Sequence, residues 1–215
     1  MTVSTVSGLY VITDARLMPA PVFLERAEAA LRGGARVLQY RDKGDAVAEA
    51  PRRRGQAGAL RELCEHYNAL FVINDDPLLA RKVGARAIHV GADDVPLTAL
   101  RAQMGRATII GASCYGSVRR AQEAMAQGAD YVAFGSFFAS PSKPDAPRVR
   151  TDILTAARAA VGLPLVAIGG ITEANGRAVI TAGADALAVI SGVFAAADVE
   201  GAARRFTALF DGRKE

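Results

Sequence analysis

Tryptophan is absent from this sequence of 215 residues, and cysteine and histidine occur only twice each. Aromatic residues make up 6% of the chain, which is few for a protein that stacks nucleic-acid bases on its surface. The net charge is +4, but the basic residues are scattered, and the one run, Arg52 to Arg54, is typical of a solvated stretch. We therefore expect no nucleic-acid partner.

Long apolar segments and cysteine motifs are missing as well. No apolar run approaches the roughly 18 residues of a membrane span, and the first residues lack the pattern of a secretory signal. Cys64 and Cys114 have the spacing of neither a CxxC motif nor a metal site, so we expect free thiols in a reducing compartment. The 51% hydrophobic and 22% charged residues are typical of a globular chain. These observations predict a cytoplasmic protein with no membrane partner.

A short motif, Gly-Ala followed by Arg or Asp, recurs four times, beginning at Gly34, Gly84, Gly128 and Gly183. Each copy follows an alanine-rich, charged stretch of helical period, so its glycine suits the position just past a helix. Each copy also precedes a short apolar run, which is typical of a strand buried on both faces. The motif therefore marks repeated helix-to-strand junctions.

Four further apolar runs lie between the copies, so strands are expected about every 25 residues, the length of one strand–helix unit. The eight runs cover residues 9–13, 37–40, 70–74, 87–90, 107–111, 131–134, 165–169 and 186–190. The expected helices cover about 20–32, 46–68, 76–83, 96–104, 117–127, 151–161, 173–182 and 196–210. Eight such units predict an α/β fold in which residues 1–215 form a single (β/α)8 TIM barrel domain. The alternative is a doubly wound open sheet, which usually has fewer strands.

A barrel enzyme carries its active site at the carboxyl ends of its strands, and glycines follow the last two strands here. Gly169-Gly170 and Ser191-Gly192 would let backbone N–H groups approach a phosphate closely. The alternative is that these glycines only terminate strands. A long loop after the sixth strand carries further hydroxyls and a lysine, and loops of this length are often functional.

Charged side chains follow the second, third and fourth strands. Asp75 and Asp94 suit a hard cation such as Mg²⁺, which takes one or two carboxylates together with waters and phosphate oxygens. Arg41, Lys43 and Lys143 suit a diphosphate. The alternative is that Arg41 pairs with Asp75, or Lys43 with Asp94, in structural salt bridges.

Other reactive side chains have simpler interpretations. His89 lies within an apolar run and is more typical of a packed strand histidine than of a catalyst, and His66 lies on an expected helix surface. Cys114 follows the fifth strand, but no suitably placed histidine accompanies it, so we do not expect a cysteine nucleophile.

Seven motifs, each at the end of an expected strand, together resemble the thiamine phosphate synthase (thiamine-phosphate pyrophosphorylase) family. They are Gln39-Tyr-Arg-Asp-Lys43, Phe71-Val-Ile-Asn-Asp-Asp76, His89-Val-Gly-Ala-Asp-Asp94, Gly111-Ala-Ser113, Gly135-Ser-Phe-Phe-Ala-Ser-Pro-Ser-Lys143, Ile168-Gly-Gly-Ile171 and Val189-Ile-Ser191. The resemblance begins before them, at Leu9-Tyr-Val-Ile-Thr-Asp14. The resemblance covers nearly the whole chain. Serines at 140 and 142, where the family commonly has threonines, keep the hydroxyls.

The resemblance implies a transferase that joins hydroxymethylpyrimidine diphosphate to a thiazole phosphate, with or without its carboxylate, and releases diphosphate. The implied pyrimidine diphosphate contacts are Gln39, Tyr40, Arg41, Asp42, Lys43, Asn74, Ser113 and Lys143, of which Arg41, Lys43 and Lys143 would be catalytic. The implied thiazole phosphate contacts are Ser140, Pro141, Ser142, Gly170, Ile190 and Ser191, and the implied ligands of one Mg²⁺ per subunit are Asp75 and Asp94. The expected partners are small molecules, and a homo-oligomer is compatible with the sequence.

Two other functions are compatible with the same barrel. A thiazole tautomerase would isomerise the thiazole phosphate and would need neither the metal nor the diphosphate contacts present here. A non-catalytic binding or regulatory protein would hold thiazole phosphate without turnover. Formation of thiamine phosphate would distinguish the synthase from both.

Overall fold

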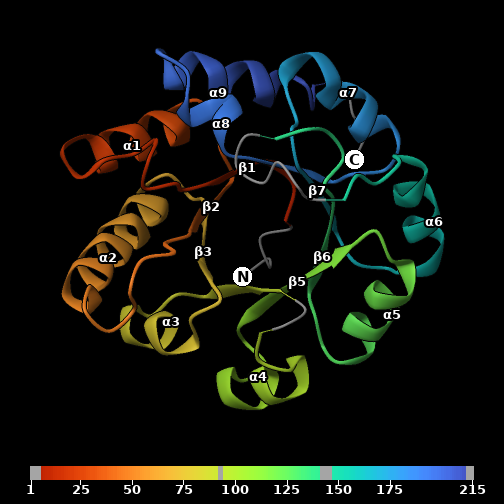
Figure 1. The fold of residues 1–215 in the computed structure, drawn as a ribbon, viewed down its shortest axis with the longest axis horizontal. Coiled ribbons are helices and arrows are strands. Elements are labelled where there is room, and N and C mark those ends of the chain that lie inside the picture. The colour runs from red at the N-terminus through yellow and green to blue at the C-terminus, as the bar shows by residue number, and fades with distance from the viewer. Residues whose placement is uncertain (1–5, 92–93, 141–146, 212–215) are drawn as a thin grey trace.

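The computed structural model describes residues 6–91, 94–140 and 147–211. Eight parallel strands pair in chain order and close into a barrel (Figure 1), which confirms the expected (β/α)8 fold. The strands are β1 (Gly8–Ile12), β2 (Val37–Tyr40), β3 (Leu70–Asn74), β4 (Ala87–Val90), β5 (Ile109–Tyr115), β6 (Tyr131–Phe134), β7 (Leu165–Ile168) and β8 (Ala186–Val189). Strand β5 extends further than its apolar run, because a register shift between Ser113 and Tyr115 lets it continue along β6.

Helices surround this barrel on its outside (Figure 1). They are α1 (Phe23–Arg32), α2 (Ala50–His66), α3 (Pro77–Val83), α4 (Leu97–Met104), α5 (Val118–Ala126), α6 (Asp152–Ala160), α7 (Glu173–Thr181), α8 (Ser191–Phe194) and α9 (Val199–Ala208), with a 3-10 turn η1 (Ala20–Val22) before α1. The helix expected at 196–210 is shorter, and the turn α8 precedes it directly after β8. No helix within the described ranges is both long and apolar enough to cross a membrane.

The repeated motif has the role that its sequence predicts. Gly34, Gly84, Gly128 and Gly183 all have positive φ angles, between 68° and 120°, a conformation that glycine adopts without a Cβ clash. In the two copies that end in aspartate, the carboxylate accepts a backbone hydrogen bond from the preceding strand: Asp130 from Ile110 on β5 at 2.7 Å and Asp185 from Leu165 on β7 at 2.8 Å. Each motif thus both ends a helix and ties adjacent strands together.

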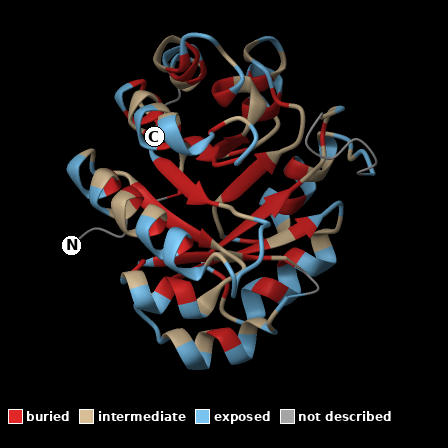
Figure 2. Ribbon diagram, turned by 60° about the vertical axis from the view of Figure 1, so that its left-hand side comes forward, coloured by how far each residue is buried: buried red, intermediate tan, exposed pale blue. Residues whose placement is uncertain are grey.

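The fold contains two apolar cores, because successive residues of each strand point to opposite faces of the barrel. The outer core lies between the barrel and the helices, whose buried faces turn inward (Figure 2). The inner core fills the barrel with Val6, Tyr10, Ile12, Val37, Leu70, Val72, Ala87, Ile109, Tyr131, Ala133, Val166, Ala186 and Ala188. Small residues here leave room for two tyrosine rings.

Gly111 on β5 leaves room for one of these rings, that of Tyr131. A Cβ at this position would lie 2.0 Å from Cζ of Tyr131, inside the ring's van der Waals surface. We therefore expect Gly111→Ala to lower the free energy of unfolding by about 1–3 kcal/mol, measured by urea denaturation. Gly55→Ala is the matched control, since nothing lies within 4 Å of that Cβ on exposed helix α2, and it should be neutral or stabilising. Equal stability of Gly111→Ala and wild type would contradict the packing argument.

Candidate active site

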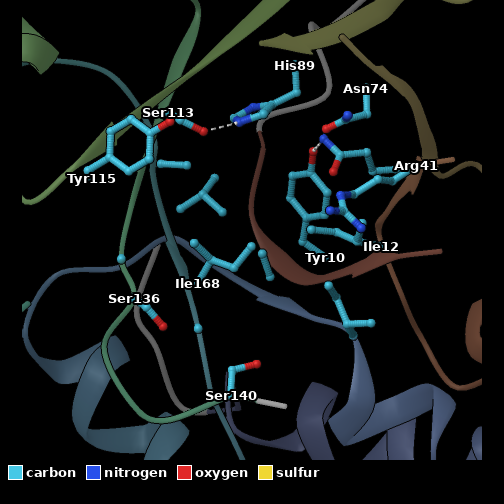
Figure 3. Close-up of a pocket in the computed structure, with 17 residues that line it drawn as sticks. Tyr10, Ile12, Arg41, Asn74, His89, Ser113, Tyr115, Ser136, Ser140 and Ile168 are labelled. Atoms are coloured by element: carbon cyan, nitrogen blue, oxygen red, sulfur yellow. Dashed lines mark hydrogen bonds between the residues drawn. The ribbon is translucent and has the colours of Figure 1, made fainter. Parts of the chain in front are cut away.

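A cavity of about 180 Å³ opens at the carboxyl ends of the strands (Figure 3). Its walls are Tyr10, Ile12, Gln39, Arg41, Asn74, His89, Ser113, Tyr115, Ala133, Gly135, Ser136, Ser140, Val166, Ile168, Gly169, Ala188 and Ile190. Six residues predicted from the sequence are among them, namely Gln39, Arg41, Asn74, Ser113, Ser140 and Ile190. The fold therefore brings together residues from strands far apart in the sequence at the position where barrel enzymes bind substrates.

The cavity has a polar half and an apolar half. Strands β2 to β5 contribute Gln39, Asn74, His89 and Ser113 at or near their carboxyl ends, whereas β6 to β8 and β1 contribute mainly alanine, valine and isoleucine. The hydrogen-bonding groups therefore lie on four consecutive strands and face an apolar wall. This arrangement suits a flat ring whose edge carries polar groups.

A chain of hydrogen bonds crosses the floor of this cavity. Gln39 Nε2 donates to the Tyr10 hydroxyl at 3.1 Å, and the Tyr10 and Tyr131 hydroxyls are 3.0 Å apart. His89 Nδ1 lies 3.1 Å from the Tyr131 hydroxyl. His89 Nε2 lies 3.0 Å from Ser113 Oγ, and Figure 3 shows this second contact. Burial lowers the pKa of His89 to about 4, so the ring is neutral at pH 7. We call these five residues the floor network.

The two tyrosines of the floor network are not among the site residues predicted from the sequence. They lie in apolar runs that predict buried strands, and that prediction is confirmed, since Tyr10 and Tyr131 are 2% and 0% exposed. The available signal was their place on the inward-facing side of each strand, where a buried hydroxyl needs a hydrogen-bond partner. His89 is indeed packed within a strand, as predicted, but both ring nitrogens also make hydrogen bonds at the cavity.

Arg41 follows β2 and is held at its backbone, where its N–H donates to Thr13 Oγ1 at 2.9 Å and its carbonyl accepts from the same hydroxyl. The side chain lines both the main cavity and a second, outer cavity of about 560 Å³ next to helix α2. No described residue forms a hydrogen bond or ion pair with its guanidinium. Arg41 thus offers an available cation at the edge of the main cavity.

Tyr40 and Asp42 lie on the outer cavity rather than the main one. The Tyr40 hydroxyl lies 3.1 Å from Asp42 Oδ2 and 3.0 Å from Gln56 Oε1, and the residue is only 2% exposed. Arg52 binds the Asp42 carboxylate at 2.7 Å. Burial alone would raise the pKa of Asp42, but hydrogen bonds from the Gly44 amide and Arg52 lower it overall. These contacts fix the loop that carries Arg41 and Lys43.

Asp75 and Asp94 lie together at the ends of β3 and β4. Lys43 Nζ is 2.8 Å from Asp75 Oδ2, so Lys43 pairs with Asp75 rather than with Asp94, and Asn74 donates to the same oxygen at 2.5 Å. Burial raises the pKa of Asp75, but hydrogen bonds from Lys43 and Asp94 lower it overall. Burial and the neighbouring Asp75 raise the pKa of Asp94. The carboxyl pair is thus close enough to share a proton.

This carboxyl pair fits a divalent cation, because a metal would relieve the repulsion between the two carboxylates. No group of three acidic, histidine or cysteine ligands occurs in the part of the chain that the structure describes. Mg²⁺ does not require one, since it commonly keeps several waters and binds through one or two carboxylates and substrate phosphates. The donor set is compatible with Mg²⁺ on these grounds.

Gly169 and Gly170, after β7, have φ angles of 103° and 61°. A Cβ at Gly170 would lie 2.2 Å from the Ala139 carbonyl oxygen, so the two loops approach too closely for any side chain. Gly169 and Ile190 line the cavity, while Gly170 and Ser191 follow directly in the chain and are not among its walls. Ser140 lines the cavity from the loop after β6, and Pro141, Ser142 and Lys143 lie outside the described residues.

The sequence predicts that the run Arg52 to Arg54 is solvated, but this prediction is wrong for Arg53. Arg53 is 7% exposed and its Nη1 lies 3.3 Å from Asp76 Oδ2. The other carboxylate oxygen of Asp76 accepts the Leu79 amide at 2.8 Å and caps helix α3. Arg53 therefore forms an ion pair with Asp76, the residue that follows Asp75, and helps to fix its position.

Both cysteines are buried, as is expected of packed thiols. Burial raises the pKa of each thiol to about 12, so neither forms a thiolate at neutral pH. We expect Cys64 and Cys114 to react with an aromatic disulfide reagent at pH 8 only after unfolding, with two thiols per chain in denaturant. Rapid reaction of the native protein with one equivalent would instead identify an activated cysteine.

Comparison with known proteins places these features in a family. A family model described as thiamine monophosphate synthase matches residues 9–193. A thiamine-phosphate synthase from Acidithiobacillus ferrooxidans is 79% identical over 210 residues, which cover 98% of this chain and 97% of the relative. Another from Thioalkalivibrio sulfidiphilus is 50% identical over 204 residues, with 95% of each chain covered.

Solved structures agree with the sequence comparison. A thiamine phosphate pyrophosphorylase from Pyrococcus furiosus superposes with a TM-score of 0.84 at 37% identity and covers 94% of each chain. A 3-hexulose-6-phosphate synthase superposes with a TM-score of 0.68 at 20% identity, covering 94% of this chain and 99% of that structure. The second similarity shows a shared barrel fold and no more.

Proposed function

Because the chain belongs to the thiamine monophosphate synthase family, we propose that this transferase joins hydroxymethylpyrimidine diphosphate to a thiazole phosphate and releases diphosphate. The observation that carries the proposal is the juxtaposition of the cavity's polar half with Arg41, Lys43 and the carboxyl pair at one rim of the barrel. A ring with a charged diphosphate tail needs both kinds of surface. The apolar half remains available for the second ring.

The pyrimidine diphosphate is assigned to the side of β2 to β5. Gln39 and Asn74 would hold polar atoms of the pyrimidine ring, while Ser113 and Arg41 would bind diphosphate oxygens. Lys43 lies beside Asp75 and would bind the same group from the rim. Lys143 remains assigned to the diphosphate by its sequence motif alone.

The thiazole phosphate is assigned to the side of β6 to β8. Ile168 and Ile190 supply apolar contacts for a ring, and Gly169, which also lines the cavity, would present its backbone to the phosphate. Ser140 adds a polar group at the cavity wall. Ser191 and the loop residues Pro141 and Ser142 complete the assignment from their motifs.

We further propose that Asp75 and Asp94 hold one Mg²⁺. The cation would neutralise charge on the departing diphosphate, which is a recognised role of Mg²⁺ in phosphate chemistry. Its binding would replace the proton that the carboxyl pair can share, because two ionised carboxylates then have a common cation. Lys43 would keep its contact with Asp75 and contribute a second positive charge at the same rim.

The proposed reaction is a dissociative substitution. The carbon–oxygen bond to diphosphate breaks first, and both electrons leave with the diphosphate, which Arg41, Lys43 and Lys143 stabilise. The remaining pyrimidinylmethyl cation is then attacked by the thiazole nitrogen, whose electron pair forms the new carbon–nitrogen bond. No proton must be removed for this bond to form, so the site requires positioned charges rather than a general base. The neutral His89 is consistent with this.

Product analysis tests the proposal. Purified protein is mixed with both substrates and Mg²⁺, thiamine phosphate is measured by mass spectrometry, and each substrate is omitted in turn. We expect thiamine phosphate only when both substrates are present. Isomerisation of the thiazole phosphate alone would identify a tautomerase, and binding of thiazole phosphate without any product would identify a binding protein. Either result would overturn the proposal.

A further inference from the structure

The floor network joins side chains from five strands through four consecutive hydrogen bonds. Only its two ends, Gln39 and Ser113, belong to the substrate contacts proposed above. Tyr10, Tyr131 and His89 lie between them and also line or pack beneath the cavity. The function of the three middle residues follows from the direction in which the protons point.

Gln39 sets which atom donates and which accepts in the first hydrogen bond of the network. Its Nε2 group donates to the Tyr10 hydroxyl, which therefore accepts at this end and has one proton left to give. The next neighbour of that hydroxyl is Tyr131, 3.0 Å away. Burial raises the pKa of both phenols, so each keeps its proton and can act as a donor. Tyr10 can therefore donate to Tyr131, and we adopt this order because it gives the buried Tyr10 proton an acceptor.

The order of donors and acceptors continues from Tyr131 through His89 to Ser113. Because the Tyr131 hydroxyl accepts from Tyr10, its own proton is directed to His89 Nδ1 at 3.1 Å. A ring nitrogen that accepts a hydrogen bond carries no proton, so the proton of the His89 ring is on Nε2. That N–H donates to Ser113 Oγ at 3.0 Å. The serine hydroxyl is then an acceptor towards the protein and retains its own proton.

We propose that Tyr10, Tyr131 and His89 are positioning residues that fix His89 with its proton on Nε2 and thereby turn the Ser113 proton towards an anionic oxygen in the cavity. The identity of that oxygen, a diphosphate oxygen, rests on the proposed function. The tautomer itself does not, because it follows from hydrogen bonds within the protein.

The charges around the cavity agree with this role. Arg41 and Ser113 both line the cavity; Arg41 can only donate hydrogen bonds, and a donating Ser113 would be a second donor to an anion held there. With the opposite proton order, Ser113 would donate to His89 and present only lone pairs to the diphosphate. Gly111 supports the network, because its missing Cβ makes room for the Tyr131 ring on the neighbouring strand.

Nitrogen-15 NMR of the free protein measures the tautomer directly. The chain contains only two histidines, so His66→Gln leaves His89 as the one histidine in the spectrum. His66 is exposed on helix α2 and its replacement does not touch the cavity. At pH 7 we expect the proton on Nε2 of His89. A proton on Nδ1, or a charged ring, would overturn the proposal whether or not the chain makes thiamine phosphate.

A double-mutant cycle tests whether His89 acts through Ser113. The readout is the Kd of inorganic diphosphate with Mg²⁺, measured by calorimetry, so that no turnover is required. We expect Ser113→Ala to raise the Kd about 10–100-fold and Ser113→Thr to retain most of the affinity. His89→Phe should raise the Kd several-fold alone but less than about twofold in the Ser113→Ala background.

His66→Phe is the matched control for the aromatic substitution and should leave the Kd unchanged. Circular dichroism checks that His89→Phe remains folded. Additive effects of His89→Phe and Ser113→Ala would show that His89 acts independently of Ser113 and would overturn its positioning role. Failure of the wild-type protein to bind diphosphate would overturn the assignment of the anion, and with it the proposed function, while the NMR result would still decide the tautomer.

Discussion

Asp75→Asn is expected to lower the kcat of thiamine phosphate formation about 10²–10³-fold, the usual scale for losing one preorganised group that stabilises developing charge. The substitution removes the carboxylate that contacts Lys43 and faces Asp94. It therefore weakens the proposed Mg²⁺ site and leaves the departing diphosphate with less positive charge. Binding of thiazole phosphate should change little, because that substrate is assigned to the opposite side of the cavity.

Asparagine is the appropriate replacement because Asp75 has a φ angle of 58°. Asparagine adopts this left-handed conformation readily, whereas alanine would add backbone strain and obscure the result. Asp152→Asn is the matched control, since Asp152 lies on exposed helix α6 and pairs only with Arg150 among the described residues. An equal loss of thiazole phosphate binding and turnover in folded Asp75→Asn would argue against a metal role.

Arg41→Gln is expected to raise the KM for the pyrimidine diphosphate about 100-fold, because hydrogen bonds to charged groups contribute roughly 1.5–3 kcal/mol and an arginine can make two of them. The guanidinium has no partner among the described residues, so its removal leaves none of their polar groups unpaired. Steady-state kinetics with each substrate varied in turn would measure the effect. The KM for thiazole phosphate should remain within about twofold of wild type.

Arg119→Gln provides the control for this charge change. Arg119 lies on helix α5, is largely exposed, pairs with Glu123 and is not among the walls of the cavity. Its replacement lowers the net charge by the same amount but should leave both KM values unchanged. If Arg41→Gln and Arg119→Gln behave alike, Arg41 does not contact the diphosphate.

Much of the fold could be predicted because β/α alternation leaves a strong signal. The strands are nearly continuous apolar runs, and the Gly-Ala motif marks four of the helix-to-strand junctions. The end of β5 was harder to predict, since Ser113 and Tyr115 continue the strand with side chains that resemble a loop. The division of the last helical region into α8 and α9 likewise depends on local capping by Asp198.

The candidate site could be predicted where polar residues lie at or near the carboxyl end of a strand, as Gln39, Asn74 and Ser113 do. Period-two alternation alone also places Tyr40 on the outer face, although its motif groups it with substrate contacts. The floor network was not predictable in the same way, because Tyr10 and Tyr131 look like ordinary core residues until the barrel closes and brings their hydroxyls within 3.0 Å. The inward-facing position of each tyrosine indicates that its hydroxyl needs a hydrogen-bond partner, but it does not indicate which distant residue that partner is.

The most direct test of the central claim is the metal dependence of diphosphate release. Protein freed of metal with a chelator is mixed with both substrates, and diphosphate and thiamine phosphate are measured together as Mg²⁺ is added. We predict negligible release without Mg²⁺, followed by saturable formation of the two products in equal amounts. Full activity in excess chelator would contradict the proposal that Asp75 and Asp94 bind a metal that assists diphosphate departure.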